Sequence, residues 1–382
     1  MPTSYDVIII GAGSMGMSAG YHLAKNNVKV LLIDKFDPPH TAGSHHGETR
    51  LIRHAYSGSG TYTAMALRAD KLWTELEEDC GQQLLVRSGV LNMGAAESAN
   101  LEVKRQAAVD FGIQVEQLAA DEIRKRWPGV QPPDTYVGLY ESKAGYLNSE
   151  ACVRAYRQQA LAAGARLLVN TQVTNIQVHT SGVTVHTLDG AYHADQLVLS
   201  AGAWFGTLED IVKLPIRSVR KAVAWFQSDQ ALYDASVFPG FTFGADHGGF
   251  YGFPSINGSG VKIGRHDAGQ VWKPGQLFAP FGAYPDDEQD LRRALEAFLP
   301  QAAGRVVRTA VCKYEMTPDE HFIIDRHPVH KHVLLAGGFS GHGFKFASVV
   351  GEMLKDLIQK GQTNYDISSF ALSRFQSAES VQ

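Results

Sequence analysis

Basic and imidazole side chains are concentrated in one short segment, residues 44–56, whose sequence is SHHGETRLIRHAY. Its histidines do not repeat at helical i, i+4 spacing and no cysteine is near, so no metal site is predicted. The pair Arg50 and Arg53 could instead supply positive charge beside a cofactor and a carboxylate substrate, because an arginine fork binds carboxylate through two hydrogen bonds. The alternative interpretation is a solvated loop, in which arginines form only surface ion pairs.

Three residues elsewhere could also take part in chemistry. Cys312 lies in the strand-like run RTAVCKYEMTPDEHFIID, and its thiol is either a small buried hydrophobe or a group that reacts with a cofactor. Lys262 lies in the strand-like run GVKIGRH, and most strand lysines face solvent. Lys345, in SGHGFKF, follows a glycine loop at a predicted helix start, where a cation opposes the helix dipole. That local conflict is typical of a functional residue.

The elements that position these residues begin with DVIIIGAGSMGMSAGYHLAKNNVKVLLID. A β-forming run leads into Gly11, Gly13 and Gly16, and a helix follows. Gly11 permits a tight turn, Gly13 lets a pyrophosphate approach the backbone, and Gly16 lets helix and strand pack closely. The helix N-terminus offers N–H groups to phosphates. The pattern predicts a dinucleotide-binding turn.

A second strand is predicted over residues 28–33 and ends on Asp34, which can accept hydrogen bonds from a ribose diol. Before this strand, Asn26 and Asn27 stand where a glycine often ends the helix, and asparagine tolerates the left-handed conformation. With strand, helix, second strand and terminal acid all present, the glycine spacing is specific evidence for dinucleotide binding.

Two later segments are expected to return to this domain. The first has a helix over 150–164, then hairpins broken at Ser181-Gly182 and Asp189-Gly190, then a strand over 196–200. This strand ends in the small residues Ala201, Gly202 and Ala203. The second, HVLLAGGFSGHGFKFASVVGEMLKDLIQKG, is predicted to be a strand, a glycine loop and an amphipathic helix that returns to the first domain.

The remaining segments, such as VRKAVAWFQ, GGFYGFPS and GVKIGRH, indicate a largely antiparallel sheet that forms the wall of a substrate cavity. The predicted fold class is therefore α/β with an α+β second domain, and the two domains are interleaved. Residues 1–83, 141–214 and 318–382 form the Rossmann-like domain, and residues 84–140 and 215–317 form the substrate domain.

Composition narrows the function classes. A formal net charge of −4 and the lack of a basic stripe argue against nucleic-acid binding. The three cysteines are odd in number and far apart, so no disulfide framework is predicted. The first strand starts within a few residues of Met1, which leaves no room for a signal peptide, and no apolar run reaches membrane-spanning length. These features predict a cytoplasmic protein that binds no membrane.

Five segments carry a resemblance to a known family: GAGSMGMSAGYHLAK, HTAGSHHGETRLIRHAY, YGFPS, DEHFIID and GFSGHGFKFAS. Together they resemble monomeric sarcosine oxidase and its relative N-methyltryptophan oxidase, essentially from end to end. The resemblance implies a D-amino-acid-oxidase-like fold and FAD attached covalently through a cysteine thioether. It also implies oxidation of N-methyl amino acids by O₂, with release of formaldehyde, the primary amino acid and H₂O₂ by a monomeric enzyme.

The resemblance assigns roles by position. It makes Cys312 the covalent FAD attachment, Lys262 the residue that promotes the reaction with O₂, and Arg53 with Lys345 the clamp on the substrate carboxylate. It places Tyr251 and His266 in the substrate site and Arg50 and His46 beside the flavin ring. The expected FAD-binding residues are Gly11, Gly13, Ser14, Met15, Gly16, Asp34, Lys35, Ser44, His45, Thr49, Arg50, Val173, Ala201, Gly202, Trp204, Cys312, Gly341, Gly343, Phe344 and Lys345.

The preferred substrate stays open at this stage. Some segments are closer to sarcosine oxidase, whereas VRSGVLNMG and VRKAVAWFQ are closer to N-methyltryptophan oxidase. Thr242 stands where sarcosine oxidases tend to have a larger apolar residue, which would widen the cavity. One alternative is a related flavin amine oxidase that acts on a cyclic imino acid (proline or pipecolate) or a fructosyl amino acid. A non-catalytic FAD- or NAD-binding protein is disfavoured, because it would not need Cys312, Lys262, Arg53 and Lys345 together.

Overall fold

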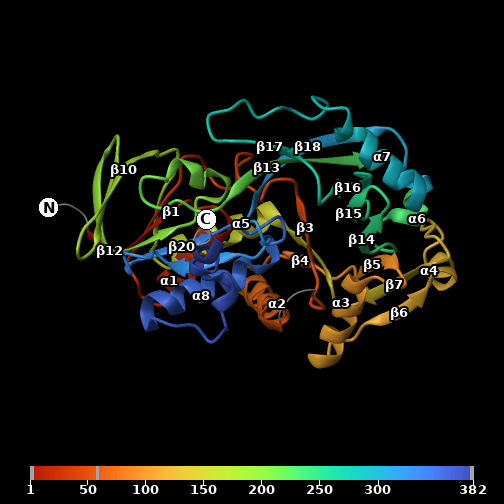
Figure 1. Cartoon of the computed structure of the whole chain (residues 1–382), viewed down its shortest axis with the longest axis horizontal. Helices are drawn as coiled ribbons and strands as arrows, with labels where there is room; N and C mark the ends of the chain where they lie inside the picture. The colour runs from red at the N-terminus through yellow and green to blue at the C-terminus, as the bar shows by residue number, and fades with distance from the viewer. Residues whose placement is uncertain (1–3, 57–59, 379–382) are drawn as a thin grey trace.

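The computed structural model describes residues 4–56 and 60–378, and its two larger sheets lie at opposite ends of the molecule (Figure 1). The first sheet is built around β1 (Ser4–Ile10), whose apolar residues from Val7 onward are buried. β1 pairs in parallel with β2 (Val30–Ile33) and with β12 (Gly190–Leu199). Strands that are covered on both faces form such continuous apolar runs. The predicted Rossmann-like arrangement is confirmed.

The later segments return to this sheet as predicted. β12 pairs in parallel with β20 (Val333–Gly337), which pairs with β19 (Ile323–Arg326), and β2 pairs with β9 (Arg166–Leu168). The predicted hairpins are β10 (Val173–Val178) and β11 (Val183–Thr187), which extend the first half of β12. The expectation of a strand from residue 28 was wrong by two residues, because the Val28 N–H still donates to the carbonyl of Leu23 in the preceding helix.

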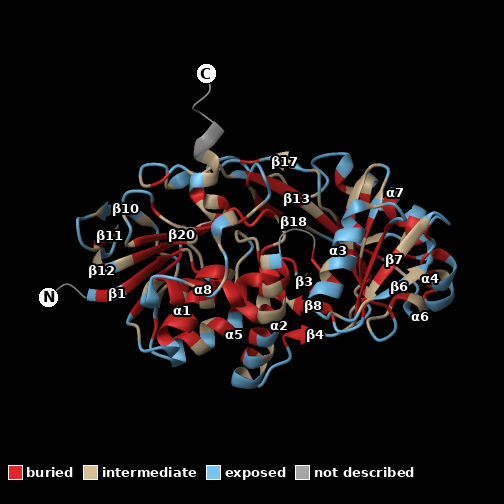
Figure 2. Cartoon of the chain, turned by 60° about the horizontal axis from the view of Figure 1, so that its bottom comes forward, coloured by how far each residue is buried: buried red, intermediate tan, exposed pale blue. Residues whose placement is uncertain are grey.

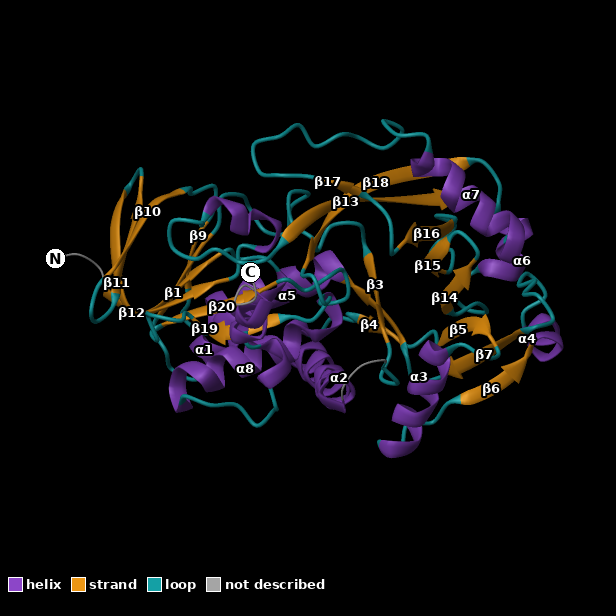
Figure 3. Ribbon diagram, viewed as in Figure 1, coloured by secondary structure: helices purple, strands orange, loops and turns teal. Residues whose placement is uncertain are grey.

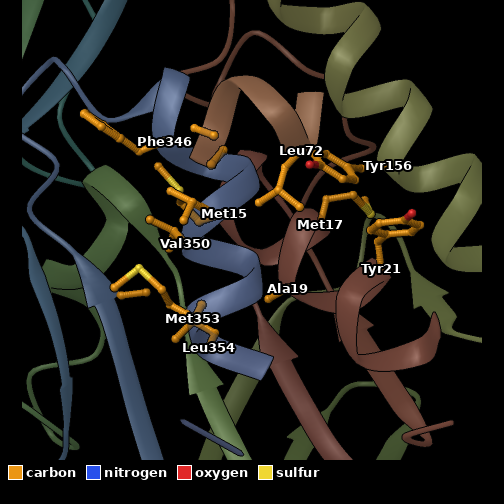
Figure 4. Packing of buried hydrophobic residues seen from close by; sticks show 14 of the residues in the cluster. Met15, Met17, Ala19, Tyr21, Leu72, Tyr156, Phe346, Val350, Met353 and Leu354 are labelled. Atoms are coloured by element: carbon orange, nitrogen blue, oxygen red, sulfur yellow. The ribbon is translucent and has the colours of Figure 1, made fainter. Parts of the chain in front are cut away.

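Four helices pack together on one side of this sheet, and the first of them packs against its strands (Figure 3). They are α1 (Ser14–Lys25), α2 (Gly60–Cys80), α5 (Ser149–Ala162) and α8 (Ala347–Lys360). Figure 4 shows the apolar side chains between them, with Met17 of α1, Tyr156 of α5 and Val350 of α8 in one cluster. Asn27 ends α1 with a φ of 62°, as the asparagine pair predicted.

The second large sheet combines strands from two parts of the chain. The first part gives β5 (Val90–Ala95), β6 (Glu116–Ala119) and β7 (Tyr136–Glu141). The second gives β13 (Arg217–Phe226), β14 (Gly240–Ala245), β15 (Gly248–Phe253), β16 (Val261–Arg265), β17 (Gln270–Val271) and β18 (Val306–Met316). Its strands pair antiparallel except β5 with β14, so the largely antiparallel prediction is confirmed.

Helices and a small sheet complete the fold. α3 (Ala99–Asp110), α4 (Ala120–Arg126), α6 (Gln230–Tyr233) and α7 (Asp286–Phe298) lie around the second sheet. α7 contributes Leu291, Leu295 and Phe298 to its core, and Figure 2 shows buried residues gathered on the strands of both sheets. A three-stranded sheet of β3 (Thr49–Ile52), β8 (Gly145–Asn148) and β4 (Leu85–Val86) lies between them. The predicted domain bounds stay a prediction. Within the described residues, no helix has the length and apolar character needed to span a membrane.

Candidate active site

The smaller of two cavities lies beyond the carboxyl ends of β1, β2 and β12 and measures about 460 Å³. Gly11 lines it with a φ of +91°, and a Cβ there would lie 2.5 Å from the carbonyl oxygen of Ser200. A Cβ on Gly16 would overlap the carbonyl oxygen of Gly11. Both positions therefore require glycine, the first for its backbone angle and the second for close packing of helix on turn.

Polar groups suited to a dinucleotide converge on this cavity. α1 begins at Ser14 with Gly13 as its N-cap and no side-chain cap, so its first backbone N–H groups stay available to a phosphate. Asp34 at the end of β2 accepts hydrogen bonds from the N–H groups of Ala12 at 2.8 Å and Phe36 at 2.9 Å. This carboxylate fixes the glycine turn as well as lining the cavity. The residues present thus fit a dinucleotide cofactor.

The larger cavity measures about 840 Å³ and adjoins the smaller one, because Ser14, Met15, Ser44, Glu315 and Phe339 line both. Its walls come from the three-stranded sheet, the second large sheet, α3 and the loop before α8. A ligand that fills the smaller cavity can therefore extend into the larger one.

Two cations meet within the larger cavity. Lys345 is 4% exposed, and its Nζ donates to the carbonyl of His342 at 2.8 Å. Its Nζ lies 4.9 Å from the ring centre of Tyr56, and the Arg53 guanidinium carbon lies 5.5 Å from the same ring. Burial first, and then the charges of Arg53 and Lys104, hold the pKa of Lys345 well below its usual value. Within the described residues, neither Lys345 nor Arg53 has a carboxylate partner, so the pair fits an anionic ligand.

His266 and Tyr251 line the same cavity. Burial, followed by the charges of Lys221 and Arg53, lowers the pKa of His266 to about 4, so its ring is neutral at pH 7. The hydroxyl of Tyr251 lies 3.4 Å from that of Tyr314, and burial raises the pKa of Tyr251 to about 12. This wall therefore presents neutral polar groups opposite the cations.

Lys262 lies one layer behind the cavity walls. Its Nζ donates to Thr49 Oγ1 at 3.1 Å, to the Thr49 carbonyl at 3.2 Å and, in a closer contact, to the carbonyl of Gly47. It lies 4.7 Å from the ring centre of Phe253 and 5.1 Å from that of Trp225. Burial first, and then the charge of Arg50, hold the pKa of Lys262 well below its usual value. Lys262 thus braces the segment that carries Arg50.

Arg50 has hydrogen bonds on one side and cavity on the other. It donates to the carbonyls of Thr49 at 2.7 Å, Ser44 at 2.7 Å and His46 at 2.5 Å, and it also lines the larger cavity. The His46 ring lies against Glu150, with 3.5 Å between Nδ1 and Oε1. The three carbonyls fix the guanidinium at the cavity wall.

The three cysteines have different environments. Cys312 on β18 lines the larger cavity, opposite Lys221 of β13. Cys152 is buried in α5 within the helix core, and burial raises the pKa of its thiol. Cys80 ends α2. Of the three cysteines, all within the described residues, Cys312 is therefore the one that lines either cavity.

The structure brings most of the predicted residues to the two cavities. The smaller cavity takes Gly11, Gly13, Ser14, Met15, Asp34, Lys35, Ser44, His45, Val173, Ala201, Gly202 and Trp204. The larger takes Ser14, Met15, Ser44, Arg50, Arg53, Tyr251, His266, Cys312, Gly341, Gly343, Phe344 and Lys345. Of the predicted residues, all of them within the described ranges, Gly16, His46, Thr49 and Lys262 lie behind these walls and not in them.

The wall residues that sequence reasoning missed include Tyr56, Lys104, Glu315 and His342. Tyr56 and His342 lie inside quoted segments and hydrogen-bond each other at 2.8 Å, a pairing 286 residues apart in sequence. Lys104 had a signal in the sequence, because its helical spacing from Leu101 and Ala108 puts it on the apolar face of a helix, and the structure buries all three. Glu315 had none, since strand alternation alone does not distinguish a buried carboxyl from a solvated one.

Comparisons with known proteins agree with this geometry. A family model described as FAD dependent oxidoreductase, DAO, matches residues 6–357. Monomeric sarcosine oxidase of Bacillus sp. (strain B-0618) is 47% identical over 386 residues, covering 100% of this chain and 99% of that protein. N-methyl-L-tryptophan oxidase of Escherichia coli (strain SMS-3-5 / SECEC) is 43% identical over 377 residues, covering 97% of this chain and 100% of that protein.

Among solved structures, NikD, an unusual amino acid oxidase essential for nikkomycin biosynthesis, superposes with a TM-score of 0.83 at 24% identity. The match covers 97% of each chain and concerns the fold. The predicted D-amino-acid-oxidase-like fold and FAD dependence are therefore confirmed. This chain belongs to the DAO family of FAD-dependent oxidoreductases, in the group of monomeric sarcosine oxidase and N-methyl-L-tryptophan oxidase.

Proposed function

We propose that this chain is an FAD-dependent oxidase that demethylates N-methyl amino acids. In the balanced reaction, R–NH–CH₃, O₂ and H₂O give R–NH₂, formaldehyde and H₂O₂. One observation carries the proposal: Arg53 and Lys345 meet, without a carboxylate partner among the described residues, in a cavity that adjoins the dinucleotide cavity. Two cations beside one aromatic ring are suited to hold the carboxylate of an amino acid.

FAD, when bound, accepts a hydride equivalent from the substrate and passes the electrons to O₂. Gly11, Gly13 and the N-terminus of α1 would hold its pyrophosphate, and Asp34 its ribose. Arg53 and Lys345 would hold the substrate carboxylate and so orient the carbon that reacts. Because burial disfavours the Lys345 ammonium, arrival of a carboxylate favours proton uptake at its Nζ.

We also propose that Lys262 supplies positive charge when O₂ is reduced: burial disfavours its ammonium, and the negative charge that develops on O₂ would favour protonation of its Nζ. Its Nζ is anchored by Thr49 and Gly47 and lies in an aromatic, buried setting, where a charge acts over several ångströms with little screening. Lys262 lies behind Arg50, and both side chains donate hydrogen bonds to the carbonyl of Thr49.

Covalent attachment of FAD through Cys312 is part of the proposal, supported by the position of this thiol in the cavity wall. A C–S bond would form to the flavin methyl carbon while one C–H and the S–H bond break, and O₂ would take the two electrons and two protons. Mass spectrometry of the denatured protein is expected to show the FAD mass on the peptide containing Cys312. Loss of all flavin on denaturation would refute the attachment and leave the oxidase proposal intact.

The proposal also includes action as a monomer, supported by the description of the Bacillus relative as monomeric, and a cytoplasmic location, which remains the expectation from the sequence. The deciding assay measures H₂O₂ release with sarcosine, N-methyl-L-tryptophan, L-proline, L-pipecolate and a fructosyl amino acid in parallel. We expect kcat/KM to be highest with an N-methyl amino acid. A clear preference for proline, pipecolate or the fructosyl compound would replace this proposal by the corresponding amine oxidase.

One hydrogen bond in the wall of the larger cavity supports the proposal that substrates larger than sarcosine fit. Thr242 lines the larger cavity, and its hydroxyl donates to Asn92 Oδ1 at 2.8 Å. The hydroxyl is thereby held toward β5, which limits how far this side chain reaches into the cavity. Thr242→Leu is expected to lower kcat/KM for N-methyl-L-tryptophan more than for sarcosine, and an equal loss for both would contradict this role.

A further inference from the structure

Helix α3 carries an uncommon residue on its buried face. Leu101, Lys104 and Ala108 occupy positions i, i+3 and i+7, and their exposures are 6%, 7% and 5%. A lysine at the centre of an apolar stripe is costly to bury, unless its ammonium finds an anionic or polar partner. Lys104 is therefore a residue whose environment within the fold needs an explanation.

The described part of the chain gives Lys104 neither a hydrogen bond nor an ion pair. Its side chain instead lines the larger cavity, beside Ser98 and Asn100 at the start of α3. Burial, and then the charge of Arg53, lower the pKa of Lys104 to about 7. The ammonium thus lacks a counter-charge among the described residues and faces a space that a ligand can enter.

The same charges act on the carboxylate clamp. Arg53 and Lys104 are the two charged residues that, after burial, depress the pKa of Lys345. Three cations therefore share one region of the cavity. Arg53 and Lys345 suffice for a single carboxylate, because one guanidinium already provides two parallel hydrogen bonds. The positive charge of Lys104 is therefore not needed to bind that carboxylate.

Acidic residues of the cavity wall do not neutralise the charge of Lys104. Asp246, Asp319 and Glu320 are exposed, and Asp319 is paired with Arg374 at 2.8 Å. Glu315 is buried where the two cavities adjoin, accepts a hydrogen bond from Gly338, and has its pKa raised to about 8 by burial. The missing negative charge must come with the ligand.

Resting on the proposed function, we propose that Lys104 is a specificity-determining residue that binds a second anionic group of the substrate. The favoured substrates are then N-methyl amino acids with a carboxylate on the side chain. They would be demethylated in the same balanced reaction as sarcosine. Lys104 would contribute binding of the distal carboxylate, while Arg53 and Lys345 hold the carboxylate at the α-carbon.

The experiment compares N-methyl-L-glutamate with N-methyl-L-glutamine, which has the same shape without the second charge. We expect the wild type to prefer the acid, and Lys104→Gln to lower kcat/KM for the acid by ten- to a hundredfold while changing that for the amide less than about threefold. This range corresponds to about 1.5–3 kcal/mol for a hydrogen bond between charged groups. Lys104→Arg is expected to restore part of the preference, and Lys71→Gln, on the exposed face of α2, serves as matched control.

A binding readout separates this inference from the proposed function. Titration of the flavin absorption spectrum with methylthiosuccinate and (methylthio)acetate needs no turnover. Lys104→Gln is expected to weaken the diacid at least tenfold and to leave the monoacid within about threefold. Equal affinities in wild type and variant for the diacid would overturn the inference even if sarcosine is oxidised. Selective loss of the diacid without H₂O₂ release from any secondary amine would support the anion site and refute the proposed function.

Discussion

Glu141 holds the segment that carries Arg53, and its replacement is expected to weaken both stability and substrate binding. Its carboxylate is 1% exposed and accepts hydrogen bonds from the N–H groups of His54 at 3.0 Å and Ala55 at 3.3 Å, in addition to a close contact with His54 Nδ1. The other ring nitrogen of His54 lies 2.8 Å from Asp70, which Arg87 holds through two contacts of 2.8 Å.

The size of the effect follows from this network. Removing one partner of a buried ion pair costs about 3–5 kcal/mol, so Glu141→Ala is expected to lose that amount. Glu141→Gln keeps the volume and one acceptor oxygen but removes the charge, and is expected to cost about 1.5–3 kcal/mol. Because Arg53 immediately precedes His54, the looser segment should also raise KM for sarcosine several-fold at unchanged FAD content.

The pH dependence distinguishes this network from simple packing. Burial alone would lower the pKa of His54, but hydrogen bonds to Asp70 and Glu141 outweigh it and raise the pKa to about 9. The folded protein therefore binds a proton more tightly than the unfolded chain, whose histidine titrates near 6.5. The resulting stability is full below about pH 6.5 and disappears as pH rises through about 9.

Urea unfolding at pH 6 and pH 9.5 measures this contribution. The free-energy difference between wild type and Glu141→Gln is expected to be larger at pH 6 than at pH 9.5. Glu116→Gln, which breaks the surface pair with Arg126, is the matched control and should cost at most about 1 kcal/mol at either pH. A Glu141→Gln difference that is the same at both pH values would refute the proton-linked network.

Three other substitutions test the site. Lys262→Met is expected to slow reoxidation of the flavin by O₂ far more than its anaerobic reduction, because the charge matters only when O₂ takes electrons; equal slowing in stopped-flow measurements would argue against the assignment. Arg53→Gln and Lys345→Gln should each lower kcat/KM by about ten- to a hundredfold and weaken (methylthio)acetate much more than a neutral amine of equal size, whereas equal weakening would indicate general disruption. Gly16→Ala should lose bound FAD, because a Cβ at this position overlaps the carbonyl of Gly11. Gly244→Ala is the control and should retain FAD, because a Cβ at Gly244 would have no other atom within 4 Å. A flavin content equal to wild type in Gly16→Ala would contradict the close packing.

Local patterns sufficed to bring the glycine turn and Asp34 to the smaller cavity, because the forces that shape this turn act between residues near in sequence. The glycine turn, the helix start and Asp34 lie within 24 residues of one another, and each requirement is visible in residue type. The same holds for Asn27, whose left-handed backbone follows from its side chain. The position of a side chain relative to a cavity, in contrast, depends on contacts between residues far apart in sequence. Lys262 meets Gly47 across 215 residues of sequence, so no local pattern could say that it lies behind the wall.

The buried charged residues of the site show why some functional residues can be predicted from the sequence and others cannot. His54 is charged and buried, yet Glu141 and Asp70 complete its hydrogen bonds inside the fold, so its charge stabilises structure. Lys104 and Lys345 are equally buried, but the described residues give them no carboxylate, and burial disfavours their charged forms. Burying an unpaired cation lowers the stability of the folded protein. We therefore expect such cations where a bound ligand supplies the opposite charge. The sequence shows that a charged residue is present, but only the fold shows whether another residue of the chain carries the opposite charge beside it. A buried charge with such a partner stabilises the structure, whereas one without it indicates a binding site.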